Sequence, residues 1–66
     1  MQVSMRAARI NAGLTQEEAS KLLDISEVTL RNWESGRSAP RANKLSDICR
    51  VYRCAIGDIF VEEKSR

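Results

Sequence analysis

The sequence predicts an all-α domain on two observations: apolar residues recur at helical spacing, and residues that favour helix ends lie between the apolar segments. Ser4, Thr15 and Ser26 each stand before such a segment, and Gly13 and Gly36 follow two of them. Serine and threonine are preferred N-caps, and glycine readily adopts the left-handed conformation that ends many helices. No segment carries strand signals, so we expect a compact helical bundle without a sheet.

Four segments are expected to form helices, followed by one short helical turn. The second begins with a capping box, because Thr15 and Glu18 can each satisfy a backbone amide of the other. In the third, Leu30 and Trp33 share the inner face. The fourth carries a buried stripe at i, i+3, i+4 and i+7, formed by Leu45, Ile48, Cys49 and Tyr52. The expected ranges are 5–13, 15–24, 27–35 and 41–53, with the last turn at Ile56, Ile59 and Phe60.

Length and composition indicate one small globular domain. The chain has 66 residues, of which 42% are hydrophobic and 30% charged, and its net charge is +2. Because this length excludes a second domain, we expect one domain over residues 1–61 and a polar tail over residues 62–66. No apolar segment reaches the length of a membrane span and no secretory signal is visible, so we expect a cytoplasmic protein without a membrane partner.

Cofactors and catalysis are not expected. The chain has no histidine and two cysteines, Cys49 and Cys54, that are five residues apart. These are too few ligands for a zinc site, and the spacing is poor for a disulfide within a helix, so we expect reduced thiols. Because the chain also lacks a phosphate-binding glycine loop, we expect no enzymatic activity, no metal, no cofactor and no small-molecule ligand.

Positive charge is concentrated in the middle of the chain. Residues 31–44 hold a single acid, Glu34, and four basic side chains: Arg31, Arg37, Arg41 and Lys44. The preceding residues 15–30 are acidic. A local basic stretch is what nucleic-acid binding requires, although an ordinary solvated face has the same composition.

Residues 15–36 have the pattern of a helix-turn-helix unit, in which two short helices are joined by a turn of about three residues. The segments GLTQEEA, DISEVTLRNWESGR, AP and IGDIF follow in the order and spacing of the Cro and repressor-type helix-turn-helix family, also called the xenobiotic response element family. The resemblance covers residues 5–60. It implies a five-helix, lambda repressor-like DNA-binding domain whose third helix lies in the major groove of double-stranded DNA.

The resemblance implies two sets of DNA-contacting residues. Its base-reading positions fall on Glu27, Val28 and Asn32, with Thr29 and Arg31 beside them. Its phosphate-contacting positions are Gln16, Ser35, Arg37 and Arg41, and we add the nearby Lys44. The chemistry agrees, since asparagine can bind adenine, arginine can bind guanine or a phosphate, a carboxylate can accept from cytosine, and valine can contact a thymine methyl. The amide of Gln16, near a helix N-terminus, suits a phosphate oxygen.

Each of these residues also has a simpler interpretation. Arg31 and Asn32 would be solvated on an exposed helix in any case, and Val28 could pack against the preceding helix. Gln16 could be an ordinary first-turn residue. Glu27 could be present only because an acid at a helix N-terminus interacts favourably with the helix dipole.

The resemblance further implies an ion pair between Arg9 and Glu34, which we interpret as structural and partly buried rather than functional. The sequence departs from the family where glycine is usual, at Asp24 in the turn and at Arg53 after the fourth helix. Aspartate tolerates the left-handed conformation, so the turn should survive. Arg53, together with Ala55 in place of a capping serine, predicts a less well anchored last helix.

We therefore expect a small sequence-specific transcription regulator, Cro-like and of phage or mobile-element origin, that binds an operator as a homodimer formed in solution or on DNA. The alternative is a protein-interaction module of the same fold, an antirepressor or antitoxin that binds a repressor or toxin. That alternative is favoured by one acid and four apolar residues that could form a partner surface: Glu27, Leu22, Ile59, Phe60 and Val61.

Overall fold

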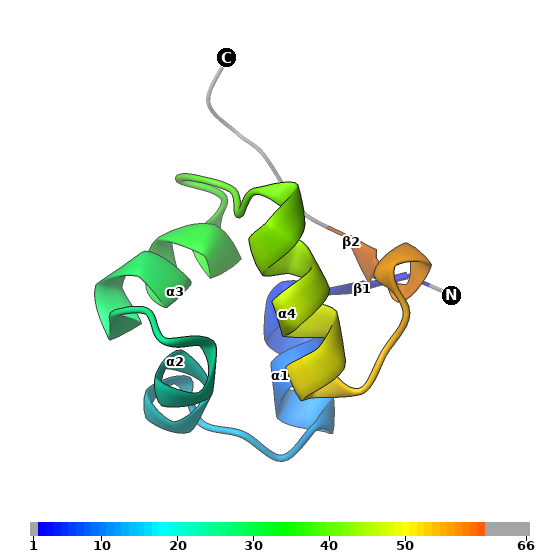
Figure 1. Cartoon of the computed structure of the whole chain (residues 1–66), viewed down its shortest axis with the longest axis horizontal. Coiled ribbons are helices and arrows are strands. Elements are labelled where there is room, and N and C mark those ends of the chain that lie inside the picture. The colour runs from blue at the N-terminus through cyan, green and yellow to red at the C-terminus, as the bar shows by residue number, and fades with distance from the viewer. Residues whose placement is uncertain (1, 61–66) are drawn as a thin grey trace.

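The part of the chain that the structure describes, residues 2–60 without the side chain of Phe60, consists of four α-helices and a short pair of strands (Figure 1). In this computed structural model the helices are α1 (Met5–Asn11), α2 (Gln16–Leu23), α3 (Glu27–Ser35) and α4 (Ala42–Tyr52). A 3₁₀ turn (Ile56–Asp58) and the strands β1 (Val3–Ser4) and β2 (Ile59–Phe60) complete the fold. Helix α4 packs on α1, with α2 and α3 to one side and the strands to the other. The predicted all-α class is confirmed.

Three N-caps begin the helices as predicted. The Ser4 hydroxyl accepts a hydrogen bond from the amide of Ala7 at 3.1 Å, and the Ser26 hydroxyl accepts one from the amide of Thr29 at 3.0 Å. Thr15 and Glu18 form the expected capping box, in which each side chain accepts from the backbone amide of the other at 3.0 and 2.9 Å. These bonds satisfy amides that a helix leaves without an internal partner.

A left-handed residue follows each of the four helices, and after α1 it is Gly13, with φ of 78°. Gly36 follows α3 with φ of 85°, as glycine allows at low cost. Asp24 and Arg53 adopt the same conformation after α2 and α4, with φ of 58° and 59°. The expectation for Asp24 is confirmed, and α4 ends by the same geometry although Arg53 replaces the usual glycine.

One core joins all four helices. Leu23 of α2, Leu30 of α3 and Ile48 of α4 are fully buried, and Met5 of α1 is nearly so. Trp33 packs against this cluster while remaining partly exposed. The predicted inner faces of the third and fourth helices are therefore confirmed, and the core holds α3 with its opposite side towards solvent.

The end of the chain differs from the prediction. In place of a fifth helix, residues 56–58 form a single 3₁₀ turn, and Ile59 then pairs in parallel with Val3 to give a two-stranded sheet that was not expected. Ile59 is buried against the core, whereas Ile56 is 55% exposed. Pairing with Val3 satisfies backbone groups that so short a segment could not satisfy in a helix.

Two expectations concern residues that the structure does not describe. Val61 and the polar tail over 62–66 lie outside the described residues.

Among the described residues, no helix is both long and apolar enough to cross a membrane.

Candidate nucleic-acid interface

Helices α2 and α3 pack against each other across a tight turn. The turn contains Asp24, Ile25 and Ser26, and the amide of Ile25 donates to the carbonyl oxygen of Ser20 at 3.0 Å. Because Leu23 and Leu30 anchor the two helices in the core on either side of the turn, α3 is held at a fixed angle to α2. This is the helix-turn-helix geometry predicted from the sequence.

The outer face of α3 carries the predicted base-reading side chains. Glu27, Val28 and Arg31 are exposed, whereas Thr29 and Asn32 are half-buried. Val28 is 58% exposed, so it does not lie against α2 as the simpler interpretation required. Thr29 also takes part in the N-cap, since its hydroxyl oxygen accepts from the Ser26 hydroxyl at 3.0 Å.

The segment after α3 is tied back to the helix. The carbonyl oxygen of Asn32 accepts from the Ser35 hydroxyl at 3.1 Å and from the amide of Arg37 at 2.9 Å. These bonds place Arg37, which is exposed, directly beyond the end of α3. Arg41 is also exposed and occupies the N-cap position of α4 without making a side-chain capping bond. Arg37 and Arg41 therefore lie in the segment that joins α3 to α4, and both are exposed.

A buried cluster fixes α3 to α1 and α2. Arg9 Nε donates to Glu34 Oε2 at 2.7 Å, and Arg9 Nη2 donates to Glu34 Oε1 at 3.3 Å. Gln16 Nε2 donates to the same Oε1 at 3.0 Å, and Arg9 Nη1 donates to the carbonyl oxygen of Leu14 at 2.9 Å. The side chains of Arg9 and Glu34 are only 9% and 5% exposed. Such a pair persists in an apolar core because neighbouring hydrogen bonds satisfy both charged groups.

Tyr52 lies close to this cluster and is itself buried. Burial raises the pKa of Tyr52 to about 12, with the Glu34 carboxylate adding to the increase and the Arg9 guanidinium opposing it. The tyrosine therefore stays neutral through the pH range in which proteins function.

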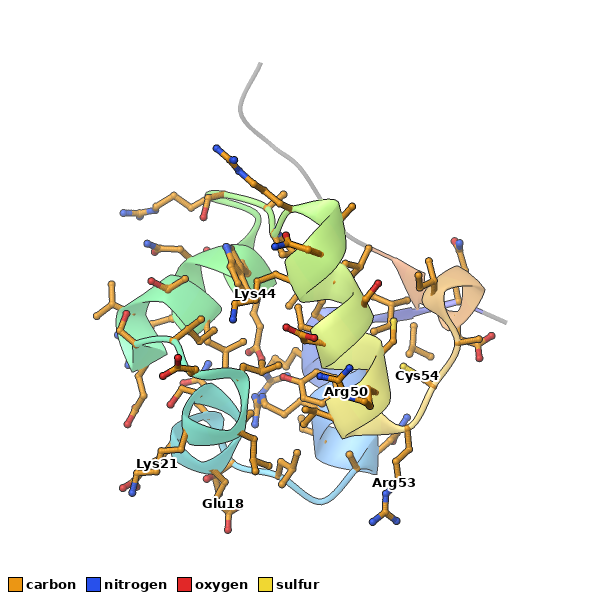
Figure 2. The ribbon with its side chains drawn as sticks, in the orientation of Figure 1. Glu18, Lys21, Lys44, Arg50, Arg53 and Cys54 are labelled. Atoms are coloured by element: carbon orange, nitrogen blue, oxygen red, sulfur yellow. The ribbon has the colours of Figure 1, made fainter. Side chains whose placement is uncertain are left out.

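Lys44 is partly buried and has partners within the domain. Its Nζ donates to the carbonyl oxygen of Leu23 at 2.9 Å and lies 4.0 Å from Oδ2 of Asp47. Figure 2 shows its side chain directed from α4 towards the turn that follows α2. A cation at a helix C-terminus stabilises unpaired carbonyls, so Lys44 helps to end α2.

Sequence reasoning missed two of these contacts. The pairing of Gln16 with Glu34 and of Lys44 with Leu23 joins residues far apart in the chain, and no spacing rule connects them. It also placed Ile59 on a partner surface, which the structure corrects, because Ile59 is 5% exposed and packs in the core.

The fold and the placement of α2 and α3 define a helix-turn-helix protein. Comparison with known families agrees, since the helix-turn-helix family of Cro and C1 type matches residues 5–59, most of the chain. The chain therefore belongs to this family of DNA-binding proteins. It is also 31% identical over 61 residues to an "Uncharacterized HTH-type transcriptional regulator" of Archaeoglobus fulgidus, covering 92% of this chain and 87% of that protein. No solved structure matches the chain significantly.

Proposed function

We propose that the protein is a sequence-specific regulator of transcription whose helix α3 enters the major groove of double-stranded DNA. The observation that carries this proposal is the exposure of Glu27, Val28 and Arg31 on one side of α3 while Leu30 anchors the other side in the core. A helix held in this way can present its first turns to base edges without losing its core contacts.

In this proposal the outer face of α3 reads bases. Asn32 pairs with adenine, Arg31 contacts guanine or a phosphate, and Val28 packs against a thymine methyl. Glu27 accepts a hydrogen bond from the amino group of cytosine. Thr29, whose hydroxyl already accepts from Ser26, contributes its methyl group at the edge of this surface.

Phosphate contacts in the proposal surround that face. Arg37 and Arg41 are exposed beyond α3, and Ser35 is exposed in its last turn. One amide hydrogen of Gln16 is used by Glu34, which leaves the second for a phosphate oxygen beside the first turn of α2. We leave Lys44 out of these contacts, because its ammonium group binds the end of α2.

We further propose that the protein acts as a Cro-like homodimer of phage or mobile-element origin, and that its two copies assemble in solution or on the operator. A symmetric dimer of this fold reads two half-sites whose centres lie roughly 34 Å apart, one turn of the double helix. The operator is then a palindrome.

Selection of bound sequences from random duplex DNA tests this function. We expect a palindromic consensus, and we expect the affinity for it to decrease steeply as salt rises, because phosphate contacts release counterions. If no sequence is enriched and the affinity for DNA does not depend on salt, DNA binding is rejected as the function. Enrichment of a single half-site without symmetry would retain DNA binding and reject the dimer.

A second candidate is a protein-interaction module, in which this fold binds another protein instead of DNA. The observation in its favour is the exposure of two apolar side chains, Leu22 of α2 at 60% and Val28 of α3 at 58%. The selection described above discriminates between the two, because a DNA-binding regulator enriches a duplex sequence and a protein-interaction module does not.

A further inference from the structure

Cys49 and Cys54 meet where α4 ends. Cys49 lies in the last turn of the helix and Cys54 two residues beyond its end. Between them Arg53 adopts the left-handed conformation, with φ of 59°, and the chain turns back so that the amide of Cys54 donates to the carbonyl oxygen of Cys49 at 2.9 Å. This type of helix ending commonly brings the side chains at these two positions into contact.

The geometry at the end of α4 allows a disulfide between Cys49 and Cys54, which their spacing in the sequence argued against. A spacing of five residues is poor for a disulfide only within a continuous helix, whereas this helix ends at Tyr52 and reverses direction. Both cysteines are free thiols. Burial raises the pKa of the Cys54 thiol, and the neighbouring Cys49 and Asp58 raise it further.

The two thiols differ in access. Cys49 is 6% exposed, whereas Cys54 is half-buried and borders an open hollow of about 350 Å³ that Val3 and Tyr52 also line. Figure 2 shows Cys54 beside the end of α4, on the side of the molecule away from α3. A small oxidant can therefore reach Cys54 first, with Cys49 behind it.

We propose that Cys49 and Cys54 are a redox pair that a hydroperoxide converts into a reversible disulfide within the native fold. The Cys54 thiol loses its proton, and the thiolate attacks one oxygen of the peroxide. The S–O bond of a sulfenic acid forms as the O–O bond breaks, and the departing oxygen takes up a proton to leave as an alcohol, or as water when the oxidant is hydrogen peroxide. The Cys49 sulfur then attacks the Cys54 sulfur. The S–S bond forms as the S–O bond breaks, and the Cys49 proton leaves with the hydroxyl as water. Two thiols are oxidised, one peroxide is reduced, and a dithiol restores the pair by exchange.

The resulting ring spans the turn at Arg53. Because it holds the end of α4 in the conformation that the reduced protein already adopts, the disulfide restricts the unfolded chain more than the native one. Since the thiol at Cys54 has a raised pKa, its thiolate fraction is small at neutral pH, and the reaction accelerates as pH rises. The proposed DNA contacts on α3 lie elsewhere, so oxidation should leave any DNA preference unchanged.

The test is oxidation of the full chain with hydrogen peroxide, followed by intact mass measurement, thiol labelling with a maleimide and thermal unfolding. We expect a monomer that has lost two hydrogens, two unlabelled cysteines, and a melting temperature about 5 °C or more above that of the reduced protein. Dithiothreitol should reverse all three. Sulfinic acids without a disulfide, or a disulfide form that melts at or below the temperature of the reduced form, would overturn the proposal.

Single variants provide the control. Cys54→Ala removes the more exposed thiol and should fold, since alanine is smaller and the site is not fully buried. It should show no reversible change in melting temperature, and Cys49, which is 6% exposed, should remain a thiol. A reversible increase that persists in Cys54→Ala would show that another group is responsible. Because none of these measurements uses DNA, the outcome is independent of the proposed function.

Discussion

Arg9 of α1 and Glu34 of α3 meet through two hydrogen bonds, the shorter of 2.7 Å, although they are 25 residues apart in the chain. Gln16 of α2 binds the same carboxylate. Three helices therefore converge on one buried acid, and the orientation of α3 depends on groups that themselves lie inside the domain. This coupling makes the cluster a structural requirement for the outer face of α3.

Arg9→Ala should lower the free energy of unfolding by about 3 kcal/mol or more, because it leaves the Glu34 charge buried and unpaired. Urea denaturation measures this loss. Arg50→Ala is a matched control: it also breaks an arginine–carboxylate pair, to Asp47 at 2.8 Å, but Arg50 is 74% exposed, so we expect a loss below about 1 kcal/mol. Equal, small losses in both variants would contradict the buried role of Arg9.

Replacement of both charges should be tolerated better than removal of one. Arg9→Met combined with Glu34→Leu leaves no unpaired charge, so we expect the double variant to be more stable than Arg9→Ala alone. The double variant should still be less stable than the wild type, because the amide of Gln16 loses the carboxylate to which it donates in the native protein. A double variant no more stable than Arg9→Ala would contradict the ion pair between Arg9 and Glu34.

The raised pKa of Tyr52 predicts that the protein loses stability in alkali. Its pKa is raised from 10.0 to about 12 in the native protein, so between these values the unfolded chain loses the phenolic proton while the native protein retains it. Stability is then fully present below about pH 10 and falls as pH rises towards 12, by roughly 2 to 3 kcal/mol. Urea denaturation at a series of alkaline pH values measures the slope, and tyrosinate absorbance follows the titration of this single tyrosine.

Tyr52→Phe isolates that contribution, because lysines also titrate in this pH range. The Tyr52 hydroxyl is buried and has no hydrogen-bond partner among residues 2–60. We therefore expect the phenylalanine variant to be as stable as the wild type at neutral pH, or up to about 1 kcal/mol more stable, and to lose less stability in alkali. A large loss at neutral pH would reveal a hydrogen bond to this hydroxyl.

Arg53 carries a strain that glycine would remove. As a non-glycine residue with φ of 59°, it should cost about 1 kcal/mol, partly offset by the greater flexibility of glycine in the unfolded chain. Arg53→Gly should therefore leave stability unchanged or raise it by up to about 1 kcal/mol. Arg50→Gly, three residues earlier inside α4, should instead lower stability by about 1 kcal/mol. In thermal unfolding, Arg50→Gly should lower the melting temperature, whereas Arg53→Gly should raise it or leave it unchanged.

The sequence predicts those parts of the fold that depend on neighbouring residues. The capping box of Thr15 and Glu18 and the left-handed turn at Asp24 are local chemistry, so they could be read directly. The pairing of Ile59 with Val3 could not, because it joins the two ends of the chain and a short apolar segment suits either a helical turn or a strand. Within the candidate site, exposure on α3 followed from helical periodicity, whereas the contact of Lys44 with Leu23 depends on how α4 crosses α2.

Arg41→Ala should weaken binding to all DNA sequences by a similar factor if Arg41 contacts a phosphate. Each lost phosphate contact should reduce the slope of log affinity against log salt by about 0.9, so a dimer should lose about twice that. Titration of one selected operator and one random duplex over a range of salt measures both effects. Arg50→Ala serves as the control, because it removes the same charge from α4 away from the proposed contacts. Loss of affinity for only one DNA sequence would assign Arg41 to base reading.

Glu27 allows the sharpest test of readout by α3. It is exposed in the first turn of the helix, where an acid is stabilised by the helix dipole by about 0.3 to 1 kcal/mol without any DNA. In the major groove the same carboxylate would accept from a cytosine amino group and be repelled by phosphates wherever that cytosine is absent. It would then lower the affinity for random DNA and increase discrimination at one base pair, with Arg31 one turn later offsetting its charge.

Glu27→Gln should therefore raise the affinity for random DNA while reducing discrimination at one base pair by roughly 1 to 3 kcal/mol. A role limited to the helix dipole predicts a different result: a small loss of stability and the same preference at every position. Affinities of the wild type and the variant for a panel of single-base operator changes separate the two. Glu17→Gln is the control, because it removes an exposed acid from the first turn of α2 rather than α3. If the preference profile of Glu27→Gln matches that of the wild type at every base pair, the negative charge of Glu27 does not contribute to discrimination between bases.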